Sequence, residues 1–382
     1  MTFRELAGEV LEIFRRGVDE PVPDHKFNDL ATRVFRFQCR ANQAYSGFVA
    51  RRGVSPDEVT RWEQIPFLPT RAFKAASLVS GDPEKVERVF RTSGTTLGRE
   101  GRGEHHVVEL ALYRENLLPN FKAHLIPEGE RLRVLCLLPP PDSAADSSLS
   151  FMMGEVVGAV GEEGSGFFMD PDGEIEGDRF RRSLRAAEGA GEPVLVVGTA
   201  FSFVGWMELA KEKGWRVDLP DGSRIMETGG YKGRSRELPR AELYRDLEIS
   251  FGVQESHIVN EYGMTELLSQ FYETVLAGTR DKDGHRKKAS PIGLAERYHR
   301  GPPWVRTRVL NPLTLETLAP GDVGVLSHLD LANLGSVAAV LTEDLGREVP
   351  GGFRLLGRSP GSEPRGCSLA MEDFRASRAG ER

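Results

Sequence analysis

The residues with the most evident chemistry form a loop rich in hydroxyl groups and glycine. Residues 91–99 read Arg-Thr-Ser-Gly-Thr-Thr-Leu-Gly-Arg and follow a short apolar run over residues 86–90, which predicts a strand entering a tight turn. Backbone N–H groups and hydroxyls in such a turn can face the oxygens of a phosphate. The Gly-Lys-Ser/Thr ending of a Walker loop is absent, so an ordinary Ser/Thr/Gly turn explains these residues equally well. The candidate phosphate-binding residues are Thr92, Ser93, Gly94, Thr95 and Thr96.

A second candidate site follows the predicted strand 257–259. Residues 260–266 read Asn-Glu-Tyr-Gly-Met-Thr-Glu and place an aromatic ring, a glycine, a hydroxyl and a carboxylate where open α/β sheets bind ligands. Glu266 could hold Mg²⁺, Thr265 could bind a phosphate oxygen, and Tyr262, beside Gly263, could stack on a base. A capped helix start with a buried tyrosine is the alternative interpretation.

Four more residues suit the same nucleotide. Gly229 and Gly230 leave the backbone free beside a flat ring, because neither residue has a Cβ. Asp344 offers a carboxylate that could accept hydrogen bonds from both ribose hydroxyls, and Arg358 is a fixed cation after Gly357. Taken singly, Asp344 and Arg358 are typical of solvated surface charges.

The elements that must position these residues fall into four predicted regions. Residues 1–85 form a helical N-terminal layer with helices over 3–17 and 30–48 and a third helix start at 55–58. Residues 86–300 alternate buried apolar runs (133–138, 193–197, 257–259) with helical patterns (149–160, 238–247). This alternation predicts an α/β core with a helix-flanked, mostly parallel sheet. Residues 301–350 form a β-rich subdomain and residues 351–382 a short tail that carries Cys367.

Composition narrows the class of protein. The 382 residues carry a net charge of −7, which argues against a nucleic-acid partner. No apolar run reaches the length of about 20 residues that a transmembrane helix needs. The acidic N-terminal segment does not fit a signal peptide, and three widely spaced cysteines do not suggest a disulfide framework. The expected compartment is the cytoplasm.

In their order along the chain, these motifs resemble the adenylate-forming superfamily of acyl-CoA synthetases, luciferases and adenylation domains. The shared signature is the Thr-Ser-Gly-Thr-Thr loop, the Gly-Gly pair, Tyr-Gly-x-Thr-Glu, the ribose aspartate and the Gly-Arg hinge, which here span residues 92–358. Segments 65–74, 260–272 and 365–369 resemble more closely the acyl-protein synthetases of the LuxE type. The resemblance implies activation of a long-chain fatty acid with ATP and Mg²⁺, and a partner acyl-protein reductase that collects the acyl group.

The same resemblance assigns the acyl-carrying nucleophile to Cys367. Arg365 and Gly366 precede it, and a nearby guanidinium would favour the thiolate while the glycine would let a flexible tail swing. The alternative role of Cys367 is that of a small residue packing a tail. Cys39 and Cys136 lie in apolar patterns. Weak candidates for an acyl pocket are Leu149, Phe151, Met152, Phe201 and Phe203.

Two departures from the superfamily leave other functions open. The phosphate loop continues Thr-Thr-Leu-Gly, and no lysine follows Lys288, where larger members carry a catalytic lysine on a C-terminal lid. Another group must then neutralise the phosphate charge, and the candidates are Arg358, Arg365, Arg99, His105 and His106. One alternative is an aryl- or acyl-CoA ligase resembling phenylacetate-CoA ligase, with CoA as the acceptor. The other is a non-catalytic nucleotide-binding homologue.

Overall fold

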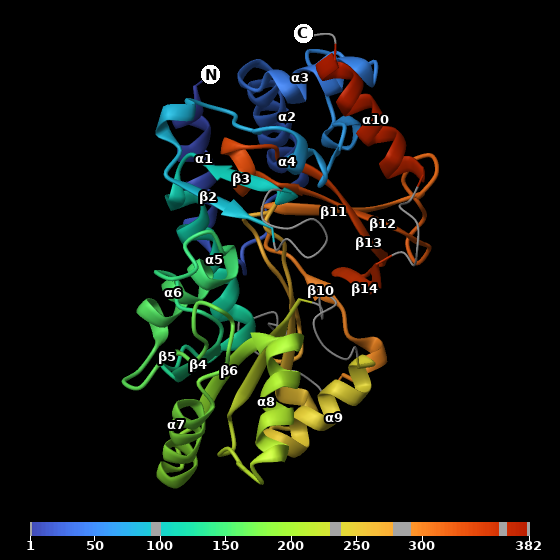
Figure 1. Ribbon diagram of the computed structural model, residues 1–382. Helices are drawn as coiled ribbons and strands as arrows, with labels where there is room; N and C mark the ends of the chain where they lie inside the picture. Colours follow the sequence, from blue (N-terminus) through green and yellow to red (C-terminus); the bar gives the residue numbers. More distant parts are fainter. Residues whose placement is uncertain (1, 93–100, 230–237, 278–291, 359–364, 380–382) are drawn as a thin grey trace. The chain divides into compact units, whose positions relative to one another are not determined.

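The computed structural model describes residues 2–92, 101–229, 238–277, 292–358 and 365–379 (Figure 1). The chain divides into two compact units. Unit 1 comprises Met1–Asn120, Met264–Gln270 and Tyr298–Arg382, and unit 2 comprises Phe121–Gly263 and Phe271–Arg297. The predicted α/β class is confirmed, since a largely parallel sheet with covering helices forms unit 2.

The sheet of unit 2 has the strand order β9-β8-β7-β6-β4-β5. The pairings from β8 through β5 are parallel, and β9 runs antiparallel to β8. The strands are β4 (Arg133–Leu137), β5 (Gly166–Phe167), β6 (Val194–Thr199), β7 (Arg224–Thr228), β8 (Ile258–Tyr262) and β9 (Phe271–Glu273). Residues 194–197 on β6 are fully buried, as expected for a parallel strand covered on both faces.

Helices α7 (Gly177–Ala190), α8 (Ala200–Glu212) and α9 (Arg240–Phe251) bury one face of this sheet. Unit 2 also contains α6 (Ser148–Val160) and the short turns η4 (Glu255–His257) and η5 (Leu294–Glu296). Alternate strand residues such as Leu135, Val196 and Ile225 share one hydrophobic core with apolar side chains of α7, α8 and α9. Predicted strands and helices in this region are therefore confirmed to within a few residues.

Unit 1 is built on an antiparallel sheet of order β11-β12-β13-β14-β10, to which β1 adds in parallel beside β13, and on the hairpin β2-β3. The strands are β1 (Leu68–Pro69), β2 (Arg88–Arg91), β3 (Glu104–Val107), β10 (His299–Arg300), β11 (Val305–Leu310), β12 (Val323–Asp330), β13 (Ala339–Val349) and β14 (Gly352–Arg358). Strand β13 is the centre of the arrangement, because β12, β14 and β1 all pair with it.

The helices of unit 1 come from both ends of the chain. They are α1 (Phe3–Arg16), α2 (Asp24–Ala41), α3 (Gln43–Arg51), α4 (Ala72–Ala75) and α10 (Arg365–Ala379), with the turns η1 (Trp62–Gln64), η2 (Pro83–Lys85) and η6 (Leu331–Gly335). Helix α5 (Leu110–Leu125) crosses the boundary between the two units in the sequence. Figure 1 shows α10 beside α3, and Phe374 of α10 lies edge-on to Phe48 of α3 with ring centroids 6.4 Å apart.

The N-terminal helices differ from the sequence expectation at two points. The Thr2–Glu5 capping box of α1 is present as predicted. The helix expected over 30–48 is broken at Asn42, which adopts extended backbone angles and caps α3 by accepting a hydrogen bond from the Tyr45 N–H at 3.0 Å. The helix start expected at 55–58 is wrong. Arg36 donates to the carbonyls of Pro56 and Val59 and thereby holds this segment as a turn.

The flexible tail expected after Gly361 is also wrong within the described residues, because residues 365–379 form helix α10. The side chains of Cys367, Ala370, Met371 and Phe374 are all buried. Their spacing is that of one helical face, and this apolar face holds the segment against unit 1.

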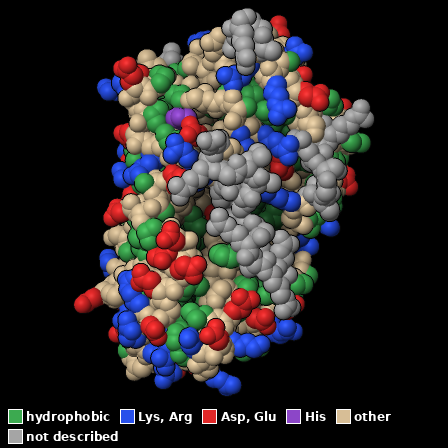
Figure 2. Space-filling view, in the orientation of Figure 1, with side chains coloured by type: hydrophobic (Ala, Val, Ile, Leu, Met, Phe, Trp, Pro, Cys, Tyr) green, Lys and Arg blue, Asp and Glu red, His purple; other side chains and the backbone are tan. Residues whose placement is uncertain are grey.

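Among the described residues no helix is long and apolar enough to cross a membrane. On the face drawn in Figure 2, side chains of both charges are interspersed over the surface.

Candidate active site

Glu266 lies in the loop Met264–Gln270 of unit 1, and buried polar side chains of β12 and η6 hold that loop. The Asn333 side-chain amide donates to the Glu266 carbonyl at 2.7 Å. Asp330 accepts from the Ser269 N–H and from the Ser269 hydroxyl, each at 2.8 Å. Burial raises the pKa of Asp330 to about 6. The backbone around Glu266 is therefore fixed by a buried, well-satisfied network.

The Glu266 side chain is itself buried, at 8% exposure, and burial raises the pKa of its carboxyl group to about 7. The positive charges of Lys74 and Arg358 act against this shift, whereas the carboxylate of Asp344 adds to it. The charges of Lys74, Arg358 and Asp344 thus all act on the Glu266 carboxyl group. Among the described residues, no ion pair joins the Glu266 carboxylate to a cation.

Thr265 is fixed through its backbone. The Thr265 carbonyl lies 2.6 Å from Nδ1 of His105, so Nδ1 must carry the proton in this contact, because a carbonyl oxygen only accepts. Burial lowers the pKa of His105 to about 4. His105 is consequently neutral at pH 7. It cannot supply the positive charge for which the sequence made it a candidate. Its ring lies edge-on to Phe73, with centroids 5.7 Å apart.

The predicted phosphate loop starts at Thr92, which pairs with Gly103. The Thr92 N–H donates to the Gly103 carbonyl at 2.9 Å, and the Gly103 N–H donates to the Thr92 hydroxyl at 2.8 Å. A Cβ at Gly103 would lie 3.2 Å from both Thr92 Cγ2 and Lys74 Cγ, so the stem of Lys74 and Thr92 meet across this glycine. Ser93, Gly94, Thr95 and Thr96 lie outside the described residues.

Asp344 and Arg358 are direct neighbours on paired strands. They face each other in the register of β13 and β14, and Arg358 Nε donates to Asp344 Oδ1 at 3.3 Å. The Arg358 side chain is 79% exposed, whereas that of Asp344 is 14% exposed. Exposed ion pairs of this kind contribute little stability, so a ligand can take over either partner at small cost.

Cys367 is placed on the buried face of α10, at 2% exposure. Its Sγ lies 3.6 Å from the carbonyl oxygen of Thr342. Thr342 precedes Asp344 by two residues on β13, a distance of roughly 7 Å along a strand. The structure thus brings the cysteine close to the predicted ribose-binding aspartate. The side chain of Arg365 lies outside the described part of the chain, so its expected effect on the Cys367 pKa stays a prediction.

In unit 2, the remaining nucleotide candidates lie at the carboxyl ends of β7 and β8. Gly229 follows β7 with φ +70°, a conformation that favours glycine, and Gly230 lies outside the described residues. Tyr262 ends β8 and is 7% exposed, with its ring 5.8 Å from that of Phe271. A Cβ at Gly263 would lie 2.3 Å from Glu261 Oε1, so the close approach requires glycine there.

The weak acyl-pocket candidates occupy two helices of unit 2. Phe151 and Met152 are buried in α6, and Leu149 beside them is half-buried. Phe203 of α8 is fully buried, with its ring 6.0 Å from that of Phe251, as a core residue would be. Phe201 is half-buried in the first turn of the same helix.

Comparison with known protein families identifies the family of the chain. The chain matches the family described as "Acyl-protein synthetase, LuxE" over residues 18–375. The chain belongs to the LuxE acyl-protein synthetase family. Membership of this family makes it a ligase, as its sequence motifs predicted.

Two curated relatives carry the name long-chain-fatty-acid–luciferin-component ligase. The protein of Aliivibrio fischeri is 24% identical over 358 residues, which are 90% of this chain and 86% of the relative. The protein of Vibrio harveyi is 23% identical over 356 residues, again 90% of this chain and 86% of the relative. Both alignments therefore extend over nearly the whole LuxE-family chain.

The solved structure of a CoA ligase confirms the adenylate-forming fold. A 2-hydroxyisobutyryl-CoA ligase in complex with 2-HIB-AMP is 13% identical with a TM-score of 0.60, over 89% of this chain and 69% of that one. The chain spans about half (49%) of ATP-bound MatB from Rhodopseudomonas palustris, which is 18% identical over 73% of this chain with a TM-score of 0.45. At these identities the similarity shows the fold alone.

The structure of this LuxE-family chain adds residues that the motifs did not predict. Lys74 lies beside Thr92 and acts on Glu266, while His105 and Asn333 hold the backbone of Thr265 and Glu266. Lys74 is the last residue of segment 65–74, which carried part of the family resemblance, and that resemblance was the sequence feature that could have indicated Lys74. Nothing in the spacing indicated His105 or Asn333 as positioning residues, because their partners are backbone carbonyls distant in sequence.

Proposed function

We propose that this protein activates a long-chain fatty acid with ATP and transfers the acyl group to its own Cys367. In the first half-reaction the fatty-acid carboxylate attacks the α-phosphorus of ATP, which gives acyl-AMP and releases pyrophosphate. In the second, Cys367 Sγ attacks the acyl carbonyl, a C–S bond forms, and the C–O bond to AMP breaks. AMP leaves with the bonding electrons, and the thiol proton passes to solvent.

The observation that carries the proposal is the contact between Cys367 of α10 and strand β13. Cys367 Sγ lies 3.6 Å from the carbonyl oxygen of Thr342, two residues from Asp344, so the proposed nucleophile lies against the strand that carries the predicted ribose ligand. A structural cysteine could occupy any buried position. The membership of the LuxE family and the adenylate-forming fold support the same pair of half-reactions.

The residues of unit 1 fit a magnesium ion that enters with the nucleotide. Mg²⁺ is commonly bound by one or two carboxylates together with substrate phosphates and water. Glu266 supplies such a carboxylate, and its pKa of about 7 leaves it ready to exchange a proton for a metal ion. Among the described residues no cluster of three or more metal-binding side chains occurs. When bound, the ion would neutralise phosphate charge.

Lys74 is the residue that we propose for neutralising the phosphate charge. Its stem lies against Gly103 beside Thr92, where the predicted phosphate loop begins, and its charge acts on Glu266. Arg358 is the second cation acting on Glu266. Fixed positive charge at developing phosphate charge is a strong source of transition-state stabilisation. Thr265, Asp344 and the loop beginning at Thr92 complete the proposed nucleotide contacts of unit 1.

The proposal also includes a partner. A protein thioester is an activated acyl group, and a reductase that accepts it would complete the reaction sequence that the family resemblance implies. The names of the two curated relatives, which are fatty-acid ligases of a luciferin component, support a long-chain acid as substrate. We propose the cytoplasm as the compartment, as the sequence led us to expect.

A labelling experiment tests the proposed function. The protein is incubated with radiolabelled fatty acid, ATP and Mg²⁺, with and without CoA. We expect label on the protein that hydroxylamine removes, because hydroxylamine cleaves thioesters. Label that appears only on CoA would contradict the proposal in favour of a CoA ligase. Absence of both label and pyrophosphate exchange would identify a non-catalytic homologue.

A further inference from the structure

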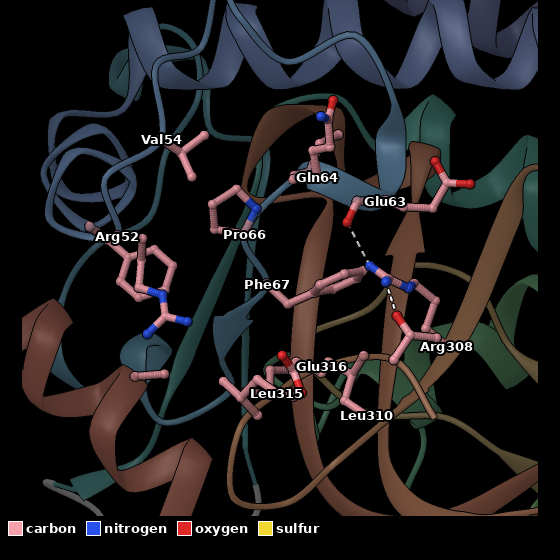
Figure 3. A pocket seen from close by; sticks show the side chains of 15 residues that line it. Arg52, Val54, Glu63, Gln64, Pro66, Phe67, Arg308, Leu310, Leu315 and Glu316 are labelled. Carbon is pink, nitrogen blue, oxygen red and sulfur yellow. Dashed lines mark hydrogen bonds between the residues drawn. The ribbon is translucent and has the colours of Figure 1, made fainter. Parts of the chain in front are cut away.

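A cavity of about 380 Å³ lies in unit 1 beside the helix that carries Cys367 (Figure 3). Its lining combines buried apolar residues, called the base below, with charged and polar residues, called the rim below. The base includes Phe67, Leu310, Leu341 and Ala370. The volume is within the range of ligand-binding pockets.

Cys367 is not itself among the lining residues, but three lining residues lie next to its immediate neighbours. Leu341 precedes Thr342, whose carbonyl Cys367 Sγ contacts. Ala370 lies three residues after Cys367 on α10, and residues three apart share a helix face. A Cβ at Gly366 would lie 2.8 Å from Leu315 Cδ2, so α10 sits directly on the cavity wall.

The burial of Cys367 restricts where an acyl chain attached to it can go. With 2% of the residue exposed, a chain on Sγ cannot lie in solvent and must run through the interior of unit 1. The cavity lies beside the helix that carries the thiol, and Ala370, three residues after Cys367, is part of its lining.

The charges at the rim favour a neutral occupant. Two arginines, Arg52 and Arg308, are matched by two carboxylates, Glu63 and Glu316. Arg52 pairs with Asp373 at 3.1 Å. Arg308 donates to the Glu63 carbonyl at 2.6 Å, as Figure 3 shows. Arg308 also donates to the Thr317 hydroxyl. A free fatty acid carries a negative charge that this rim does not complement. A thioester-linked acyl chain carries none.

We infer that this cavity holds the acyl chain while it is attached to Cys367. The inference rests on the proposed function and adds to it the place where the thioester intermediate is stored. Water is kept from the thioester as long as the chain fills the apolar base, so the cavity both limits the chain length and slows hydrolysis of the intermediate.

Variants that fill the cavity from its rim test the inference. Val54 is half-buried and Glu316 is exposed, so Val54→Trp and Glu316→Trp place an indole at the cavity without disturbing buried packing. Leu313→Trp is the matched control, because Leu313 is 60% exposed and does not line the cavity. Acids of increasing chain length are loaded with ATP and Mg²⁺, and the half-life of the hydroxylamine-labile label is measured.

We expect the filling variants to shorten the longest chain retained and to speed hydrolysis of long-chain thioesters about tenfold, the effect of exposing about two methylene groups. The rate of pyrophosphate exchange by the filling variants should stay as in the wild type. The Leu313→Trp protein should match the wild type in all of these measurements. Unchanged chain-length and hydrolysis profiles in filling variants that still form the thioester would overturn the inference. Failure of exchange or labelling in the wild type would instead refute the proposed function.

A photoreactive fatty acid with a mid-chain diazirine gives an independent measurement that needs no cavity variant. After loading and irradiation of the wild type, we expect crosslinks in segments 48–67 and 308–317 and at Leu341. We expect none of these crosslinks in Cys367→Ser. Crosslinks at these peptides in Cys367→Ser would show that the cavity binds the free acid, which contradicts storage of the thioester. Crosslinks confined to other peptides would also overturn the inference.

Discussion

At the scale of residues, burial decides the charge of the two side chains that flank the Thr265 backbone. Burial keeps His105 neutral by lowering its pKa to about 4, and it raises the pKa of Glu266 to about 7. Neither side chain can therefore act as a fixed charge of its usual sign in the unliganded protein. The positive charge that adenylation needs must come from lysine or arginine, which leads to Lys74.

Lys74→Met should reduce the rate of fatty-acid-dependent ATP–pyrophosphate exchange by about 10²-fold, the usual effect of removing one transition-state donor. Lys74→Arg should restore part of the rate, because the charge remains. The matched control is Arg71→Met, since Arg71 lies in the same segment but pairs with Glu343 at 2.5 Å. Its rate should stay within about twofold of wild type, as expected for an exposed ion pair. Equal rates for Lys74→Met and wild type would remove Lys74 from the mechanism.

At the scale of elements, the ends of β7 and β8 carry a buried carboxyl group that costs stability when ionised. Glu261 is 4% exposed and accepts a hydrogen bond from the Thr228 hydroxyl on the neighbouring strand. Burial raises the pKa of Glu261 from 4.5 to about 7. The folded state therefore binds the proton more tightly than the unfolded state. Its contribution to stability is complete below pH 4.5 and is lost as the pH rises through about 7.

Glu261→Gln should consequently become more stabilising, relative to wild type, as the pH rises. The glutamine keeps an acceptor for Thr228 but never ionises. Between pH 5 and pH 8, the difference in free energy of unfolding should grow by on the order of 2 kcal/mol. Urea titrations at several pH values measure it, with the exposed Glu248→Gln of α9 as the control. A pH-independent difference would show that Glu261 is ionised in the folded protein throughout.

The elements also show how far the sequence predicts this fold. Strands β4 and β6 were predictable because each contains a continuous apolar run, β8 because it begins with Ile258 and Val259, and α1 because its capping residues are local. Helix α10 was missed because its polar residues and Gly366 were interpreted as a loop. The sequence does show helical spacing of the apolar residues Cys367, Ala370, Met371 and Phe374. The partners that this face packs against, α3 and β1, become evident only in the structure.

The candidate site was predictable in its motifs and not in its contacts. The order of the motifs indicated Glu266, Asp344 and Arg358, because residue types in a fixed order can be recognised from the sequence alone. The pairing of Asp344 with Arg358 follows from the register of β13 and β14, which the sequence does not specify. The approach of Lys74 to Thr92 likewise depends on Gly103, a single close contact between distant segments.

At the scale of the whole molecule, one covalent intermediate links the proposed activities. Adenylation depends on the nucleotide contacts and uses no thiol. Acyl transfer depends on Cys367, and storage depends on the cavity beside α10. These steps are separable by substitution because they use different side chains, so a single variant can distinguish the first half-reaction from the second.

The most direct measurement of the central claim compares wild type with Cys367→Ser in both half-reactions. Fatty-acid-dependent pyrophosphate exchange should stay close to wild type, while hydroxylamine-labile labelling of the protein should disappear. Cys39→Ser and Cys136→Ser serve as controls and should keep the label, apart from the stability cost of a buried hydroxyl. Persistent thioester label on the Cys367→Ser protein would contradict the account.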